Sequence, residues 1–302
     1  MRTNGWELSV SWNDKINNVG GSPLMYSIGV GLADSYSTIT KFDNPEGALN
    51  NYYEGKRIGE IWGYVTDGFI QDEAEAQRMA TIQGDISKTW KVGDIRYKDL
   101  DGVEGITSAK TIYNTGDQKV IGNTTPRYSF NINASASWKG FDVRVFFEGI
   151  AKRDLWIDSP VFWGFPSNSN VWQSAVNDYH VDNSWSENNT NAYYPLPSYS
   201  GRSKQTQTKY LQNGAYIRLK DLTISYTIPK AWISTVGIEQ LKVFASGQNL
   251  WVGTKLFKYL DPDIVSTRQS NSKDNKLVGN LTSDGKAYPF SRTFSFGINL
   301  TF

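Results

Sequence analysis

The chain has 302 residues, and its 31 Lys and Arg nearly balance its 30 Asp and Glu. The clustered basic surface of a nucleic-acid-binding protein is therefore not indicated. The absence of Cys excludes disulfide scaffolds, zinc–thiolate sites and thiol catalysis. The single His, His180, lies in a polar stretch, so we expect a surface-loop histidine rather than the base of a catalytic triad. No run of about 18 apolar residues is present to predict a transmembrane helix.

Seven segments alternate apolar and polar residues with a period of two, which is typical of strands with one face in an apolar medium. In chain order, their apolar faces occupy residues 6–12, 24–32, 128–138, 141–147, 217–228, 241–245 and 294–302. The fifth segment slips by one residue at Lys220-Asp221, which predicts a β-bulge. In the sixth segment, Phe244 and Leu250 depart from the alternation.

Short and long connections alternate strictly between these strands. The short ones are Lys139-Gly140, a turn ending in Gly20-Gly21, and residues 229–240, whereas the long ones run roughly over 34–126, 152–213 and 253–291. Outer-membrane barrels have short periplasmic turns and long outer loops, and compact domains seldom contain loops of this length. The pattern therefore predicts an all-β fold, the C-terminal third of a large antiparallel transmembrane β-barrel. A soluble all-β glycan-binding module remains the alternative.

The last predicted strand carries a further signal. Its apolar face ends on an aromatic at the last residue, and we interpret this face as a barrel-assembly signal. An edge strand that happens to end in Phe is the other interpretation. The face consists of Phe294, Phe296, Ile298, Leu300 and Phe302.

Five segments carry a resemblance to a known family. They are GYVTDG at 63–68, GDIRYKDL at 93–100, GAYIRLKDLTISYTIP at 214–229, VFASGQNL at 243–250, and YP with RTFSFG within 288–297. Taken together and in this order, the sequence from residue 5 to the last residue resembles the SusC/RagA-like TonB-dependent outer-membrane transporters.

The resemblance implies a 22-stranded barrel with a plugged lumen, of which residues 1–302 form the C-terminal part. The plug domain, TonB box and signal peptide would then be absent from this sequence. It also implies TonB-dependent import of glycans or oligopeptides across the outer membrane of a Gram-negative cell, with no enzymatic activity. The implied partners are a SusD-like surface lipoprotein that caps the barrel, the TonB complex, outer-membrane lipid, and the glycan or peptide ligand.

Family members often carry an acidic turn after the GDIRY-like segment that resembles a calcium-binding loop. Here Asp99 and Asp101 offer oxygen ligands at alternate positions. Val103 occupies the position of the third carboxylate, and Glu104 lies one residue away from that position. An acidic turn is therefore favoured over a calcium site, and no other cofactor is expected.

The loop between the fourth and fifth strands is rich in aromatics among many Asn and Ser. Amphipathic aromatic rings suit contact with a sugar, contact with the lipoprotein lid, or packing of loop against loop, and all three remain open. The rings are those of Trp156, Trp163, Trp172, Trp185, Tyr193, Tyr194 and Tyr199.

Overall fold

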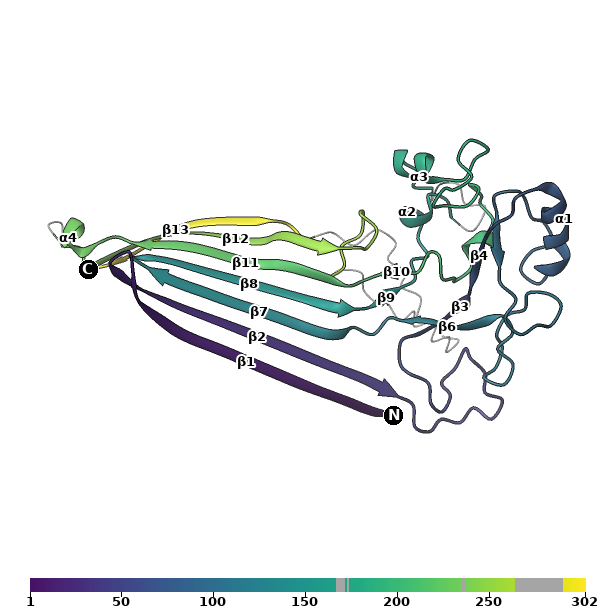
Figure 1. Cartoon of the computed structure of the whole chain (residues 1–302), viewed down its shortest axis with the longest axis horizontal. Coiled ribbons are helices and arrows are strands. Elements are labelled where there is room, and N and C mark those ends of the chain that lie inside the picture. The colour runs from purple at the N-terminus through teal and green to yellow at the C-terminus, as the bar shows by residue number, and fades with distance from the viewer. Residues whose placement is uncertain (167–171, 173, 235–236, 264–289) are drawn as a thin grey trace.

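The computed structural model describes residues 1–166, 172, 174–234, 237–263 and 290–302. Its main element is one antiparallel seven-stranded sheet, in which all seven predicted strands are present (Figure 1). In spatial order the strands are β1 (Arg2–Val19), β2 (Ser22–Thr38), β7 (Arg127–Trp138), β8 (Phe141–Lys152), β11 (Tyr216–Thr227), β12 (Gln240–Thr254) and β13 (Thr293–Thr301). The sheet is open, with β1 and β13 at its edges, and confirms the prediction of a partial β-barrel.

One face of the sheet is apolar because the strand registers bring the alternating patterns into phase. Val30 on β2 pairs with Ile132 on β7, and Ile132 pairs with Phe147 on β8. Side chains of this face reach the surface, where Trp12 is 62% exposed and Phe296 is 81% exposed. Within the described part of the chain, no second sheet covers this apolar face.

The opposite face of the sheet is polar and carries its own hydrogen bonds. The hydroxyls of Ser27 and Ser135 lie 2.8 Å apart across β2 and β7. Ser137 donates to Asp142 over 2.6 Å, and Lys242 forms an ion pair with Asp142 at 2.8 Å. A polar inner wall beside an apolar outer wall is the arrangement of a membrane barrel.

The irregular positions of the sequence pattern have local causes. On β11 the register shifts between Leu219 and Asp221 against both neighbouring strands, so the predicted bulge is confirmed. On β12, Phe244 lies on the polar face, opposite Gly297 of β13. Leu250 lies beside this register shift, where β12 skips from the partner of Asp221 to the partner of Leu219.

The connections confirm the predicted alternation of lengths. Lys139 and Gly140 have φ values of 48° and 84°, as the type I′ hairpin turn requires. The turn after β11 contains α4 (Lys230–Ile233), and the short turns lie together at the end of the sheet that also holds the C-terminus (Figure 1). The first long loop (39–126) lies at the other end, together with the described residues of the second (153–166, 172 and 174–215) and of the third (255–263 and 290–292).

The long loops fold into a compact loop head, a name used here for their described residues. The first loop contributes β3 (Glu60–Tyr64), β4 (Thr66–Phe69), α1 (Glu73–Ile82), β5 (Ile95–Tyr97) and β6 (Gln118–Asn123). The second contributes β9 (Asp154–Leu155), α2 (Pro160–Trp163), α3 (Asp178–Asn183), a 3₁₀ turn (Arg202–Lys204) and β10 (Gln212–Asn213). The hydrophobic core lies here and not against the sheet, as fully buried Ile70, Ile95 and Phe162 illustrate.

None of the helices formed by the described residues is long and apolar enough to span a membrane.

The two faces of the sheet should differ in how well they tolerate a charged side chain. In an intact barrel, Ile132→Arg should lower the free energy of unfolding by about 2–4 kcal/mol, because the guanidinium would meet lipid near the bilayer centre. Asn133→Arg, on the polar face, should cost much less. Reversible denaturant unfolding in lipid vesicles measures both values, and equal costs would contradict the assignment of the faces.

Candidate functional site

Four of the seven aromatic residues predicted for ligand or lid contact are buried in the loop head. Trp156, Trp163, Trp185 and Tyr194 are only 2%, 5%, 8% and 2% exposed. Two of these rings pack edge to face against Phe162, with centroid distances of 5.2 Å for Trp163 and 5.6 Å for Tyr194. Such pairs stabilise a core beyond the area that they bury. For these four residues, the structure shows packing of loop against loop.

The other three predicted aromatics lie nearer the surface. Tyr193 is partly buried against the same core, and Tyr210 donates a hydrogen bond of 2.8 Å to its carbonyl oxygen. Trp172 is 92% exposed and Tyr199 is 38% exposed. The ring of Tyr199 packs against Phe165 at 5.2 Å. Contact with a ligand or a lid stays a prediction, and Trp172 and Tyr199 are the two rings placed to make it.

His180 is buried, so the prediction of a surface-loop histidine is wrong. The side chain is 2% exposed and lies on α3, where Asn177 and His180 cap the helix reciprocally. The Nε2 atom lies 3.1 Å from the Phe162 carbonyl oxygen and donates to it, while Nδ1 accepts from the Asn177 backbone N–H at 3.3 Å. Burial lowers the pKa of His180. The imidazole therefore serves as a neutral element of the loop-head core.

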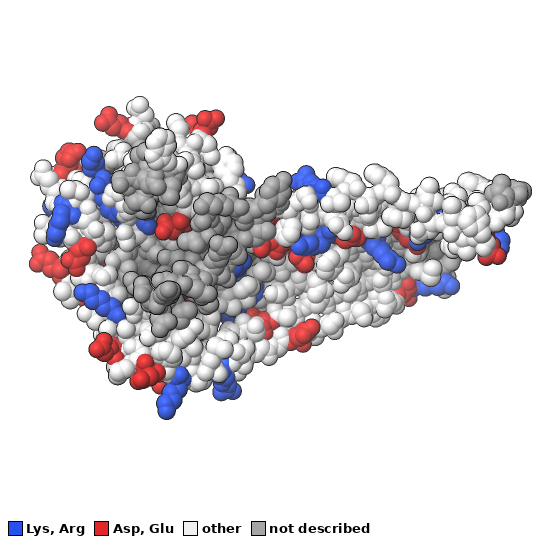
Figure 2. Space-filling model, turned by 180° about the vertical axis from the view of Figure 1, so that it is seen from behind, with Lys and Arg blue, Asp and Glu red and all other residues white. Residues whose placement is uncertain are grey.

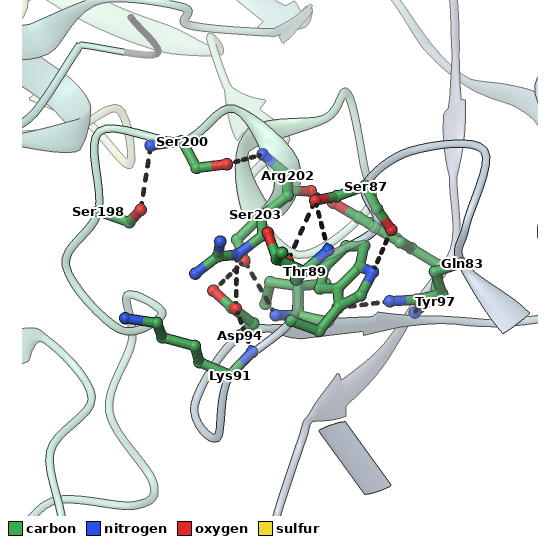
Figure 3. Close-up of polar contacts among 12 residues, drawn as sticks. Gln83, Ser87, Thr89, Lys91, Asp94, Tyr97, Ser198, Ser200, Arg202 and Ser203 are labelled. Atoms are coloured by element: carbon green, nitrogen blue, oxygen red, sulfur yellow. Dashed lines mark hydrogen bonds and ion pairs between the residues drawn. The ribbon is translucent and has the colours of Figure 1, made fainter. Parts of the chain in front are cut away.

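A buried ion pair joins the first and second long loops. Asp94 is fully buried, and its Oδ2 lies 2.6 Å from Nε of Arg202 (Figure 3). Ser203 donates to the other carboxylate oxygen of Asp94 over 2.9 Å, and the backbone N–H of Lys91 donates to Oδ2 over 2.8 Å. A buried charge is tolerated only when it is paired and hydrogen-bonded, and each oxygen here has a partner. The contacts fix the two loops against each other.

Tyr97 and Gln83, both in the first long loop, extend this junction. The Tyr97 hydroxyl donates to the Arg202 carbonyl oxygen over 2.7 Å, and Gln83 accepts from the Tyr97 backbone N–H over 2.6 Å (Figure 3). Asp94 and Tyr97 belong to the GDIRYKDL segment that carried the family resemblance. The resemblance pointed to this segment without giving its role, which is to join two loops.

The GYVTDG segment makes a second junction with the same loop. Tyr64 exchanges backbone hydrogen bonds of 2.8 and 3.1 Å with Thr206 and Thr208. A Cβ atom on Gly63 would lie 2.6 Å from the Thr206 carbonyl oxygen, so only glycine permits this close approach. Thr66 donates to the side chain of Gln207 over 2.9 Å. Both motif segments of the first loop therefore hold the second loop.

The acidic turn gains a third carboxylate from a residue that sequence spacing did not identify. Oxygens of Asp99, Asp101 and Asp117 all lie within 4.8 Å of one another. Asp117 is fully buried, and its two oxygens accept backbone hydrogen bonds from Leu100 at 2.6 Å and Thr107 at 2.7 Å. These bonds connect Asp117 to the backbone of the turn. Calcium binding by Asp99 and Asp101 stays a prediction from the sequence.

Two curated proteins of Formosa agariphila are similar to the chain. TonB-dependent receptor P3 is 30% identical over 249 residues, which cover 82% of this chain and 22% of the receptor. TonB-dependent receptor P26 is 26% identical over 222 residues, which cover 70% of this chain and 20% of the receptor. The chain thus spans about a fifth of the length of these relatives. No protein-family model matches the sequence.

Solved structures show the same fold. The RagAB peptide importer in its open-open state aligns with a TM-score of 0.66 and 18% identity, over 99% of this chain and 28% of the importer chain. Its closed-closed state aligns with the same score over 30% of that chain.

This chain is part of the barrel of a TonB-dependent receptor, and its fold is SusC/RagA-like. Such receptors are outer-membrane proteins and not enzymes, so the predicted location and the expected lack of enzymatic activity are confirmed by the relatives. The apolar face of the receptor sheet therefore faces lipid, and its polar face lines the lumen.

The junction between the loops predicts a strong effect of removing one charge. In an intact receptor, Arg202→Met should destabilise the loop head by about 3–5 kcal/mol, because Asp94 would remain buried without its cation. Protection of the head against a protease measures this change. Arg78→Met, at an exposed position of α1, is the matched control and should leave protection unchanged. Equal protection of the Arg202 variant and the wild type would contradict a stabilising role.

The buried imidazole predicts a pH dependence of the loop head. His180 has a lowered pKa in the folded state, so below its ordinary value of about 6.5 the unfolded head binds a proton that the folded head does not. The free energy of unfolding of the head should therefore fall as the pH decreases from 7.5 to 5.5. His180→Gln should flatten that slope, which protease protection at each pH measures. Identical slopes for the variant and the wild type would show that His180 does not titrate on unfolding.

Proposed function

We propose that this chain builds part of the wall and of the extracellular cover of a TonB-dependent importer for glycans or oligopeptides. The observation that carries the proposal is the division of the molecule into an apolar-faced sheet and a folded loop head at one end. On the face seen in Figure 2, charged side chains are spread over the broad loop head, and others follow the tapering sheet. The sheet suits lipid, and the head suits water and its solutes.

The ligand class rests on two different supports. RagAB, which shares the fold, is described as a peptide importer, which supports oligopeptides. Exposed amphipathic rings such as Trp172 and Tyr199 suit sugars as well as peptides. Binding and release at the head, with no covalent step, then make up this chain's share of import. Energy comes from the TonB complex acting through a plug domain within the barrel.

A SusD-like surface lipoprotein is the proposed partner of the loop head. The exposed apolar side chains Trp172 and Val181, 92% and 68% exposed, both belong to the second long loop. Buried aromatics and the Asp94–Arg202 pair hold the parts of that loop around Trp163 and Arg202, so a partner would meet a packed surface there. An interface of aromatic anchors on a rigid support is one that binds with little loss of conformational entropy.

The alternative of a soluble all-β glycan-binding module is not favoured. A sandwich would bury the apolar face under a second sheet. In the described residues that face stays open, with side chains such as Trp12 and Phe296 largely exposed. Exposed apolar surface on this scale is unfavourable in water.

The two exposed rings provide a test of the proposed surface. In an intact receptor, Trp172→Ala combined with Tyr199→Ala should weaken binding of the partner lipoprotein or of ligand at least about tenfold, since aromatic anchors dominate such interfaces. Tyr113→Ala is the matched control, because Tyr113 is 78% exposed on the first long loop. Pull-down of the lipoprotein and uptake of labelled ligand are measured separately. Normal results in both assays would remove the proposed role of these rings.

A further inference from the structure

Tyr199, one of the two rings proposed to contact a ligand or a partner, lies on a short segment that hydrogen bonds fix on its C-terminal side. Ser198 accepts a side-chain hydrogen bond of 3.0 Å from the Ser200 backbone N–H, and Ser200 accepts one of 3.2 Å from the Arg202 backbone N–H (Figure 3). Arg202 is itself held by the buried carboxylate of Asp94 at 2.6 Å. The backbone that follows Tyr199 therefore leads directly into the junction of the first and second long loops.

A buried lysine fixes the N-terminal side of the same segment. Lys204, on the 3₁₀ turn, is only 9% exposed, and its Nζ atom donates to the Ser198 carbonyl oxygen over 2.7 Å. The same ammonium group donates to the carbonyl oxygens of Phe165 and Pro166 over 2.9 and 3.0 Å. A lysine ammonium has three N–H donors, and each donor here has its own acceptor. Lys204 thus ties the residue before Tyr199 to the chain that follows α2.

The carbonyl groups held by Lys204 belong to an aromatic pair or to its neighbours in the chain. The rings of Phe165 and Tyr199 pack edge to face at 5.2 Å, and the Tyr199 hydroxyl lies 3.2 Å from that of Ser174. Because Ser198 immediately precedes Tyr199, one ammonium group fixes the backbone next to both rings of the pair. The Tyr199 ring stays 38% exposed, so a binding partner can contact a ring whose support is buried.

We propose that Lys204 is a positioning residue, whose ammonium group sets the orientation of the Tyr199 ring at the binding surface. This inference rests on the function proposed above for the ring. An aromatic anchor binds with a smaller loss of conformational entropy when its support is already ordered. Since Lys204 is buried and all three of its donors are used, it acts through Tyr199 and not by contact with the ligand.

The charge of this ammonium group changes within a range of pH that an experiment can reach. Burial lowers the pKa of Lys204 to about 8, and the carboxylate of Asp158 opposes this shift. Residues 198–204 contribute Tyr199 and also Arg202, which is paired with Asp94, and residues 165–166 carry no titratable side chain. Above the pKa, the neutral amine has two N–H donors for three carbonyl oxygens. One of the three contacts is then lost, and the support of Tyr199 should loosen.

The test uses the intact receptor, purified in a neutral detergent, with trifluoromethylphenylalanine in place of Tyr199 as a label for fluorine NMR. With Lys204 present, one narrow resonance at pH 7 should shift and broaden as the pH rises to 9. Lys204→Met should give the broadened resonance at both pH values, because its thioether donates no hydrogen bond. Lys88→Met, at an exposed position of the first long loop, is the matched control and should titrate like the wild type.

Two further measurements make the result decisive. A second receptor with the label at Tyr113, which is 78% exposed on the first long loop, reports any general effect of pH. Heat-modifiable migration on gels verifies that each barrel is folded. A narrow, unchanged resonance in the folded Lys204→Met receptor would overturn the positioning role. A wild-type resonance that stays the same from pH 7 to 9 would overturn the role of the charge.

A binding measurement separates this inference from the proposed function. The probe is a tryptic digest of casein, and mass spectrometry quantifies the peptides that the unlabelled receptor retains. Lys204→Met should reduce retention at least about threefold, and should add no loss in a Tyr199→Ala background, because one residue acts through the other. Equal losses in both backgrounds would overturn action through Tyr199. Retention that is absent or independent of Tyr199 would refute the proposed contact of this ring with a peptide, while the fluorine resonance would still decide the role of Lys204.

Discussion

The structure of this chain depends on an apolar sheet face that no other described part of the chain covers. Burial of apolar surface drives folding, and here lipid takes the place of a packed partner. In a bilayer, every backbone polar group must find its partner within the protein, which long antiparallel strands achieve through their neighbours. Some strands are also longer than is needed to cross the bilayer. A tilted strand of about 9–11 residues spans the bilayer, whereas β1 has 18 residues and β2 has 17. Their surplus length carries the loop head.

The loop head solves a different problem, because it lies in water and must form a core from connecting segments. Aromatic rings around Phe162 supply apolar area, and the buried Asp94–Arg202 pair and Tyr97 join the loops by directed bonds. Apolar packing alone is non-directional and would leave the loops free to slide. The polar junctions select one arrangement, at the cost of placing charges in a buried site. A fixed arrangement is what a binding surface at the barrel mouth requires.

The family motifs therefore have physical meanings that differ along the chain. The segment around Lys220 contains the bulge of β11, and the segment around Gln248 contains the matching irregularity of β12. The GYVTDG and GDIRYKDL segments hold one loop against the other through Gly63, Tyr64 and Asp94. None of these contacts requires a bound ligand. The motifs describe how the wall and the head are built.

The sequence by itself determined the strands, their two faces, the bulge at Lys220-Asp221 and the alternation of short turns and long loops. Alternation with a period of two is a local property of the chain, so neighbouring residues contain it. Only the tertiary structure decided that His180 and Trp156 are buried while Trp172 is exposed, and that Asp117 joins Asp99 and Asp101. Loops lack a period, and burial in them depends on which distant segments meet. Residues 94 and 202 are far apart in the sequence and meet only in the folded head, so no local pattern records that meeting.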